Sequence, residues 1–204
     1  MDLKKIFPLF SYLFHPLFIS VYATLFYFFV TRSYFYPHEI YLILFQVVIL
    51  TVFLPVSTYF LLKSLGLIRS GIMLSEKKER RLPLAFQAMF FLVLIEHSFA
   101  MLSIPELYYF FLGALISSVL ALLLLLFHFK ASLHMIGLVG FTLFIMGISL
   151  HYHIRFVNMI AFFIMAVGAV ATSRLYMHAH SMKEIIAGIV IGALPQIALW
   201  YYWL

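Results

Sequence analysis

Long apolar runs separated by short polar connectors dominate the pattern of this chain. Seven segments each hold about 20 mostly apolar residues, the length that an α-helix needs to cross a bilayer: 7–30, 39–62, 84–103, 106–128, 135–152, 155–172 and 183–203. The runs are continuous rather than alternating, and an open strand cannot satisfy its backbone hydrogen bonds in lipid. The pattern therefore predicts an all-α fold, a polytopic transmembrane helix bundle of six to seven spans that forms a single domain over residues 1–204.

One long polar connector, residues 63–83, interrupts the pattern and contains the charged run 75–81. Pro83 suits the first turn of the span that follows. At the other end of the pattern, residues 1–5 are basic and precede an apolar run, as in a signal peptide. The run is too long for a signal peptide and no small-residue cleavage site follows it, so we interpret residues 7–30 as a retained first span.

Composition places most of the chain in lipid. Apolar residues make up 66% of the 204 residues and charged residues only 10%, far from the balance of a soluble domain. Cysteine is absent, which excludes disulfides, thiolate metal sites and a cysteine nucleophile. The net charge of +6 lies mainly in connectors, where it favours lipid headgroups or an anionic substrate over nucleic acid. We expect an integral protein of a bacterial inner (plasma) membrane, whose partners are the bilayer and a membrane lipid.

Positive charge is distributed unequally between the two predicted sides. With seven spans, the side that carries the N-terminus holds 11 Lys and Arg residues, and the other side holds two. The positive-inside rule assigns the richer side to the cytoplasm. Three polar clusters lie on this richer side, in the connectors 63–83, 129–134 and 173–184. Two spans separate each cluster from the next, so the chain returns to the same face each time, as a single active site requires.

These clusters carry the side chains that bind phosphate. Arg and Lys hold phosphate oxygens and stabilise charge that develops in a transition state. The candidate phosphate-binding residues are Lys77, Lys78, Arg80, Arg81, Lys130 and Arg174. Ser132 lies just before a span, where its side chain can cap the helix and leave free backbone amides for an anion.

The clusters also carry groups for nucleophilic and acid catalysis. His180 and Glu184 are four residues apart, so they share one face of a helix. Glu184 can accept the proton of one ring nitrogen and leave the other nitrogen of His180 free to attack. His134 can act as a general acid. The set provides a nucleophile, an orienting carboxylate, an acid and an anion clamp without a metal or another cofactor.

The third cluster resembles the type 2 phosphatidic acid phosphatase superfamily, the membrane lipid phosphate phosphatases, whose third motif reads SRxxxxxHxxxD. Ser173, Arg174 and His180 match that motif in spacing, and Glu184 stands where the family has Asp. The second motif, PSGH, is matched at its serine and histidine by Ser132 and His134, with Ala and Leu in place of Pro and Gly. The first motif, KxxxxxxRP, is poorly matched, because Leu82 separates the last arginine of the basic run from Pro83.

The resemblance implies a lipid phosphate or pyrophosphate phosphatase, in the family's membrane branch, that works without metal. His180 is then the phosphohistidine nucleophile and His134 the leaving-group acid. Arg174 and members of the run Lys77, Lys78, Arg80 and Arg81 bind phosphate. Glu in place of Asp lengthens the orienting arm by one methylene, and Leu133 adds a side chain where the family's backbone approaches phosphate. A divergent member of the family is the interpretation that these departures favour.

Several of these residues also have structural interpretations. Ser181 and Glu184 fit a capping box, so Glu184 can serve to start the last span. Arg174 can be an interfacial residue whose charged head reaches water. The 77–81 run can act as a topogenic positive cluster, and His134 can be a histidine at the membrane interface.

Three other functions remain open from the sequence. The first is a non-enzymatic transporter or an inactive lipid-binding member of the family, with Glu96 and His97 at its centre; we interpret these two as a buried structural pair inside a span. The second is a phosphotransferase that passes the phosphoryl group from the same histidine to an alcohol. The third, a metal site at His151 and His153, lacks a further clear ligand.

Overall fold

The computed structural model describes residues 3–69, 71, 78–99 and 104–204, with side chains from residue 8 onward within these ranges. Helices account for most of the described chain, and these ranges contain no strand. In chain order the elements are α1 (Leu3–Leu13), α2 (Pro16–Thr31), η1 (Arg32–Tyr34), α3 (Pro37–Val48), η2 (Ile49–Phe53), α4 (Leu54–Ser64), α5 (Arg81–Ser98), α6 (Pro105–Leu126), α7 (Leu133–His151), α8 (Val157–Tyr176) and α9 (Met182–Trp203).

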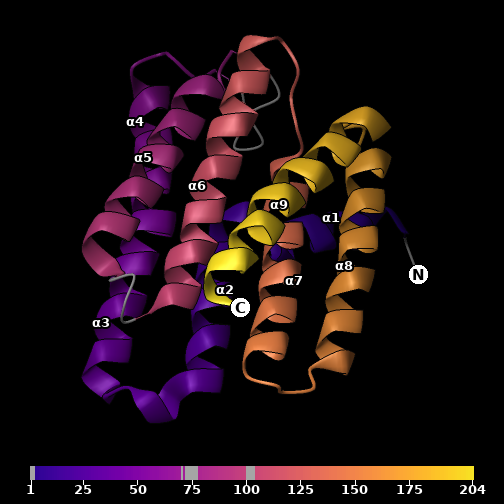
Figure 1. Ribbon diagram of the computed structural model, residues 1–204. Coiled ribbons are helices and arrows are strands. Elements are labelled where there is room, and N and C mark those ends of the chain that lie inside the picture. Colours follow the sequence, from indigo (N-terminus) through magenta and orange to yellow (C-terminus); the bar gives the residue numbers. More distant parts are fainter. Residues whose placement is uncertain (1–2, 70, 72–77, 100–103) are drawn as a thin grey trace.

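Among the described residues, six helical segments are long and apolar enough to cross a membrane: Pro16–Tyr34, Pro37–Ser64, Pro105–Leu126, Leu133–His151, Val157–Tyr176 and Met182–Trp203. α5 is a further long helix that packs alongside α6 (Figure 1) but carries polar residues at Gln87 and Glu96. The prediction of an all-α polytopic bundle is confirmed, and the chain is an integral membrane protein.

The helices form two groups that α9 and α2 join. α3, α4, α5 and α6 stand on one side of the bundle and α7 and α8 on the other (Figure 1), while α9 crosses α7 obliquely and also packs on α6. α7 is the central helix, because 61% of an 18-residue stretch of it is buried, against 22% for α8. Residues at the start of α7 are therefore held from several sides.

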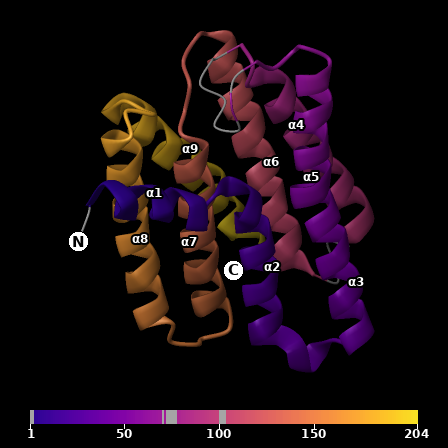
Figure 2. The same ribbon diagram turned by 180° about the vertical axis from the view of Figure 1, so that it is seen from behind.

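The predicted first span, 7–30, is wrong at its N-terminal end, because the helix breaks at His15 and Pro16. His15 has extended backbone (φ −66°, ψ 136°) and Pro16 is the first residue of α2. A proline disfavours helical backbone at the residue before it and is well placed at the first helical position. As a result α1 is a separate short helix that lies across the bundle against α8 (Figure 2).

The second span is one continuous helix, but its turn becomes wider just before Pro55. Residues Ile49–Phe53 form a π-helical turn between α3 and α4. Pro55 has no N–H, and its ring clashes with the carbonyl four residues earlier in a regular α-helix. The wider turn accommodates this ring and lets the helix continue as α4.

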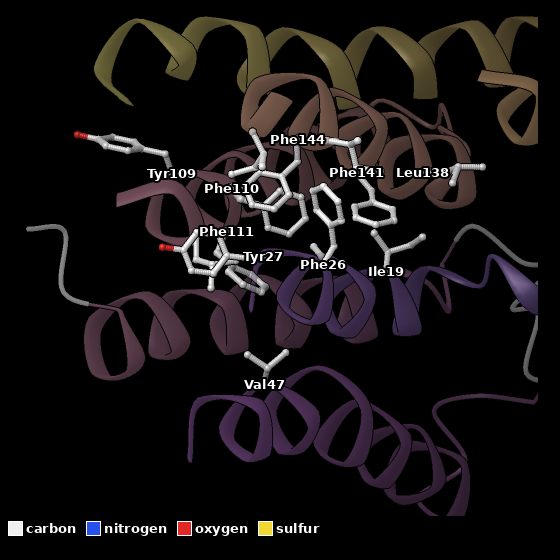
Figure 3. Close-up of a cluster of buried hydrophobic side chains, with 14 of the residues drawn as sticks. Ile19, Phe26, Tyr27, Val47, Tyr109, Phe110, Phe111, Leu138, Phe141 and Phe144 are labelled. Atoms are coloured by element: carbon white, nitrogen blue, oxygen red, sulfur yellow. The ribbon is translucent and has the colours of Figure 1, made fainter. Parts of the chain in front are cut away.

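Aromatic side chains fill the centre of the bundle (Figure 3). The ring centroids of Phe110 on α6 and Phe144 on α7 lie 4.7 Å apart, and Phe26 on α2 meets Phe144 at 6.5 Å with the rings nearly perpendicular. All three side chains are buried. The edge-to-face pair of Phe26 and Phe144 stabilises the contact beyond the area it buries. This aromatic core fixes α2, α6 and α7 to one another.

Two glycines allow α9 to approach α7 closely. A Cβ atom at Gly188 would lie 2.7 Å from the carbonyl oxygen of Ser132, and one at Gly192 would lie 2.6 Å from that of Ile136. Such distances are too short for any side chain, so only glycine permits this crossing. Small residues four positions apart are a common means of bringing two helices together in membranes. The crossing places the start of α9 beside the start of α7.

Three histidines end helices in the left-handed conformation that usually requires glycine. His128, His153 and His178 have φ of 60°, 54° and 51° and follow α6, α7 and α8 respectively. After each helix, two backbone N–H groups return to carbonyls of the last turn, as in the Schellman motif. Left-handed backbone in a non-glycine residue costs roughly 1–2 kcal/mol. The three histidines therefore serve as helix terminators in this fold.

A buried carboxylate joins three helices at the end of the bundle opposite the α8–α9 connector. Glu106, in the first turn of α6, accepts hydrogen bonds from the hydroxyls of Tyr27 (3.1 Å) and Tyr152 (2.6 Å), and Nε2 of His151 lies 3.5 Å away. Its side chain is 3% exposed. The helix dipole favours a negative charge at this position. Burial, and then Glu106, raises the pKa of Tyr152, which keeps its hydroxyl a donor.

The structure corrects our interpretation of Glu96 and His97 as a buried pair inside a span. Both residues are exposed, in the last turn of α5, which ends at Ser98. Adjacent residues on a helix point in directions about 100° apart and do not face each other. The error came from extending the predicted span to residue 103, which placed these residues too deep.

Candidate active site

The connector between α8 and α9 is built by two successive helix-end motifs. The N–H of Ala179 donates to the carbonyl of Arg174 (3.1 Å) and completes the turn that His178 makes after α8. Ser181 then caps α9: its Oγ accepts from the N–H of Glu184 (3.4 Å), and Oε2 of Glu184 accepts from the N–H of Ser181 (3.1 Å). This capping box holds the one residue between the two motifs, His180, in place.

Glu184 has both of the roles that the sequence suggested as alternatives. Besides completing the capping box, its Oε2 lies 2.9 Å from Nδ1 of His180. A carboxylate only accepts, so Nδ1 carries the proton and Nε2 of His180 has the free lone pair. The side chain of His180 is 2% exposed, and burial lowers its pKa to about 4, against the raising effect of Glu184. The ring is therefore neutral, and an available nucleophile, at neutral pH.

Lys130 extends this pair to a third residue. Its Nζ donates to the carbonyl of Ala179 (3.1 Å) and lies 3.8 Å from Oε2 of Glu184. The backbone reinforces the same junction, because the N–H of Ser132 donates to the carbonyl of Glu184 (3.1 Å). Lys130, which we predicted to bind phosphate, is thus placed to hold the carboxylate that orients His180.

His134 is held by the N-terminal helix. Nε2 of His134 lies 3.1 Å from the backbone carbonyl of Ser11, and a carbonyl only accepts, so Nε2 is the protonated nitrogen. The same residue of α1 reaches α8, where the hydroxyls of Ser11 and Ser173 are 2.7 Å apart. His134, Ser11 and Ser173 are all buried. α1 therefore connects the second and third sequence motifs.

His134 and His180 line one end of a cavity of about 280 Å³, close to the size of the smallest ligand sites. Its polar lining includes His15, Arg80, His134, Arg174 and His180. Arg174 and Arg80 are 2% and 8% exposed, so both charges are directed into the protein rather than to bulk water. The arrangement places two guanidinium groups beside a histidine whose Nε2 is free to attack.

The cavity continues from this polar end into the apolar bundle. Its lining includes Ile19, Phe60, Phe91, Phe110 and Ile136, from five different helices. Phe91 follows Arg80 by 11 positions. At a helical rise of about 1.5 Å per residue, the lining therefore extends roughly 16 Å along α5.

Two of the polar side chains that line this apolar arm are engaged by the backbone. Oγ of Ser117 donates to the carbonyl of Ile191 (2.9 Å), and Nε2 of Gln196 donates to the carbonyl of Phe110 (3.0 Å). Both residues are 2% exposed. The arm therefore offers mainly apolar surface, suited to a hydrocarbon chain.

The predicted phosphate-binding residues separate into two groups. Arg80 and Arg174 line the large cavity, whereas Lys78 is exposed and Nη2 of Arg81 is directed to the carbonyl of Leu125 (3.4 Å). Consecutive residues project about 100° apart on a helix, so a run of basic residues cannot all face one ligand. Lys77 lies outside the described residues.

Ser132 stands at the N-cap position of α7 as predicted, but the predicted side-chain cap is wrong. Its hydroxyl makes no capping hydrogen bond. Oγ is fully buried and has no hydrogen-bond partner in the described part of the chain. The N–H of Ser132, by contrast, donates to the carbonyl of Glu184 on α9. Ser132 is not among the residues that line the large cavity.

The roles of His15 and Ser11 were not predicted from the sequence. Both lie within the predicted first span, where an uninterrupted apolar pattern concealed the helix break. His15 lines the cavity and its ring centroid lies 5.2 Å from that of His134. A histidine followed by proline inside an apolar run was the available signal, because ionisable residues within spans usually face the protein interior.

In the described ranges, no group of three or more His, Asp or Glu side chains lies together as metal ligands do. His153 is exposed, and His151 is adjacent to Glu106.

Fold and site together define a polytopic helical membrane protein in which a buried histidine, hydrogen-bonded to the carboxylate of Glu184, and two buried arginines line one cavity. Comparisons with known proteins add nothing to this definition: no family model, no curated protein and no solved structure matches the chain.

Proposed function

We propose that this protein is a lipid phosphate or pyrophosphate phosphatase in which His180 is the nucleophile. One observation carries the proposal: a single cavity is lined by His180, by two arginines and by a long apolar arm. Arginine pairs bind phosphate oxygens through charge-assisted hydrogen bonds, and the arm suits a hydrocarbon tail. A phosphorylated lipid is the class of molecule that carries both groups.

In the proposed first step, Nε2 of His180 attacks phosphorus while the bond from phosphorus to the lipid oxygen breaks. Glu184 accepts the hydrogen bond from Nδ1–H and stabilises the positive charge that the ring acquires. Arg80 and Arg174 balance the charge on the phosphoryl oxygens. His134 gives a proton to the departing lipid oxygen. Because its Nε2–H is held by Ser11, His134 gives this proton from Nδ1, where the negative charge of the bound phosphate favours a second proton on the ring.

In the second step, water attacks the phosphorus of the phosphohistidine and the bond from phosphorus to nitrogen breaks. Nδ1 of the now neutral His134 accepts a proton from the attacking water, which restores the acid for the next cycle. Inorganic phosphate leaves, and His180 returns to its neutral form with Nδ1–H on Glu184. The two half-reactions balance without a metal or a redox partner.

The membrane setting favours lipids of the bacterial inner membrane as candidate substrates: phosphatidic acid, phosphatidylglycerol phosphate, undecaprenyl pyrophosphate and lipid A phosphate. The test is phosphate release from these four lipids by purified protein in detergent with EDTA. His180→Ala is compared with wild type, and His178→Ala serves as the matched control because His178 is exposed and two residues away.

We expect wild type and His178→Ala to release phosphate, and His180→Ala to lose at least about a thousand-fold in rate, as loss of a covalent nucleophile does. No release from any lipid by folded wild-type protein would overturn the proposal. Equal phosphate release by wild type and His180→Ala would contradict the histidine mechanism.

A further inference from the structure

The α1–α2 corner contributes a third histidine to the polar end of the cavity. His15 lines the same cavity as His134, Arg174 and His180. Its ring is half-buried and meets that of His134 edge-on, with centroids 5.2 Å apart and planes at 84°. This residue lies outside all three motifs that suggested the phosphatase site.

The backbone of α2 determines which ring nitrogen of His15 carries a proton. His15 is the N-cap of α2, and its Nδ1 accepts from the N–H of Leu17 at 3.4 Å. A nitrogen that accepts from a backbone N–H has no proton of its own, so the neutral ring carries its proton on Nε2. Burial, and then the charge of Arg174, lowers the pKa of His15, which favours this neutral form.

The other two histidines of the cavity do not offer an N–H to a ligand. The N–H of His134 is directed to the carbonyl of Ser11 rather than to a ligand. The N–H of His180 is directed to Glu184 in the same way. Of the three histidine rings that line the cavity, that of His15 is the one whose N–H is not used in a hydrogen bond within the described structure.

We propose that His15 is a phosphate-binding residue whose Nε2–H donates a hydrogen bond to a phosphoryl oxygen of the bound substrate. It acts as a neutral donor and transfers no proton, because a proton on Nδ1 would oppose the N–H of Leu17. The inference rests on the proposed function for its substrate, but the binding of inorganic phosphate tests it separately.

The alternative is that His15 serves only to cap α2, and two substitutions separate the roles. Serine is a good N-cap but has no donor at the position of Nε2, whereas glutamine is a poor N-cap but carries an amide N–H at the end of its side chain. A phosphate-binding role predicts loss of function in His15→Ser and partial retention in His15→Gln. A capping role predicts the reverse. His38→Ser, an exposed histidine at the start of α3, is the control.

The experiment measures two quantities for each variant in detergent. One is the affinity for inorganic phosphate, from the dependence of the melting temperature on phosphate concentration. The other is kcat/KM for the best lipid phosphate. Loss of one hydrogen bond to a charged group corresponds to roughly a 10- to 100-fold effect. We expect that loss in both quantities for His15→Ser, a smaller loss for His15→Gln, and none for His38→Ser.

Each outcome decides the question. If wild type binds phosphate and His15→Ser binds it as tightly, the inference is wrong, whatever the state of the phosphatase proposal. If His15→Ser loses phosphate affinity while wild type hydrolyses no lipid, His15 is a phosphate ligand and the proposed reaction is wrong. If wild type does not bind phosphate, the His15 inference is wrong, and phosphate release from the lipids still decides the proposed function.

Discussion

The two ends of the bundle each hold a carboxylate, in different surroundings. Glu106 accepts from two tyrosine hydroxyls and lies near His151, and these contacts join α2, α6 and α7. Glu184 also contacts a histidine, but that histidine lines a cavity together with two arginines. A carboxylate enclosed by its partners contributes to stability, whereas one that orients a group beside a cavity contributes to chemistry. Substitutions at the two ends are therefore expected to separate stability from activity.

The largest effect is expected for Glu184→Gln. Glutamine also completes a capping box, so the helix start is retained. The amide no longer selects the correct ring proton of His180, and a comparable loss in a serine protease triad lowers kcat about 10⁴-fold. We expect kcat to fall by roughly 10²- to 10⁴-fold with a nearly unchanged melting temperature. Steady-state rates and thermal unfolding of the same preparation measure both, and an active Glu184→Gln would contradict the role assigned here.

The matching substitution at the opposite end is Glu106→Gln. Two hydroxyls then lose a charged acceptor, and hydrogen bonds to charged groups contribute about 1.5–3 kcal/mol each. We expect the free energy of unfolding to fall by about 2 kcal/mol while kcat per folded molecule is unchanged. Denaturant unfolding in detergent, followed by activity at a temperature where the variant is folded, tests this. A Glu106→Gln variant that is stable but inactive would contradict the assignment of Glu106 to stability rather than activity.

The pH dependence of activity should reflect the lowered pKa of His180. The nucleophile is neutral down to a pH near its folded-state value of about 4, rather than its ordinary 6.5. We expect the acidic limb of kcat/KM to fall well below pH 6.5. A folded-state pKa below the unfolded value also means that His180 lowers stability progressively as pH falls from 6.5 towards 4, because the unfolded chain then binds more protons. An acidic limb at pH 6.5 or above would show that the buried environment is not as described.

The smallest effect is expected in the apolar arm. Ala114 on α6 lines the cavity, and Ala114→Phe shortens the space available to a hydrocarbon chain. Each methylene that loses its place in an apolar pocket affects discrimination by roughly ten-fold or more. We expect kcat/KM to fall for lipid phosphates with long chains and to change little for those with short chains. An equal loss of kcat/KM for long-chain and short-chain lipids would show that the apolar arm does not bind the hydrocarbon chain.

The sequence predicted the spans well because apolar length determines them, but it did not predict where side chains point. The break at His15 and Pro16 was concealed by apolar residues on both sides, so α1 and the carbonyl of Ser11 were missed. Arg80 and Arg81 are adjacent, yet one lines the cavity and the other faces α6. Which face of α5 is turned inward depends on packing against α6, which periodicity in a nearly uniform apolar helix does not reveal.

The candidate site was predictable to the extent that spacing along a helix encodes it. His180 and Glu184 are four residues apart at the start of α9, and they do contact each other. Spacing along a helix did not predict the positions of Lys130 and Ser132. Their contacts with Ala179 and Glu184 depend on the close crossing of α7 and α9. That crossing is set by Gly188 and Gly192, far along the chain from either residue.

The most direct test of the account is to trap the phosphoenzyme. Protein incubated briefly with a lipid carrying a labelled phosphate is quenched, digested and analysed for a phosphorylated histidine that is stable in alkali and labile in acid. The histidine mechanism predicts the label on His180 in wild type and in His178→Ala, and its absence in His180→Ala. Turnover without a labelled histidine, or with the label on His134 or His15, would contradict it.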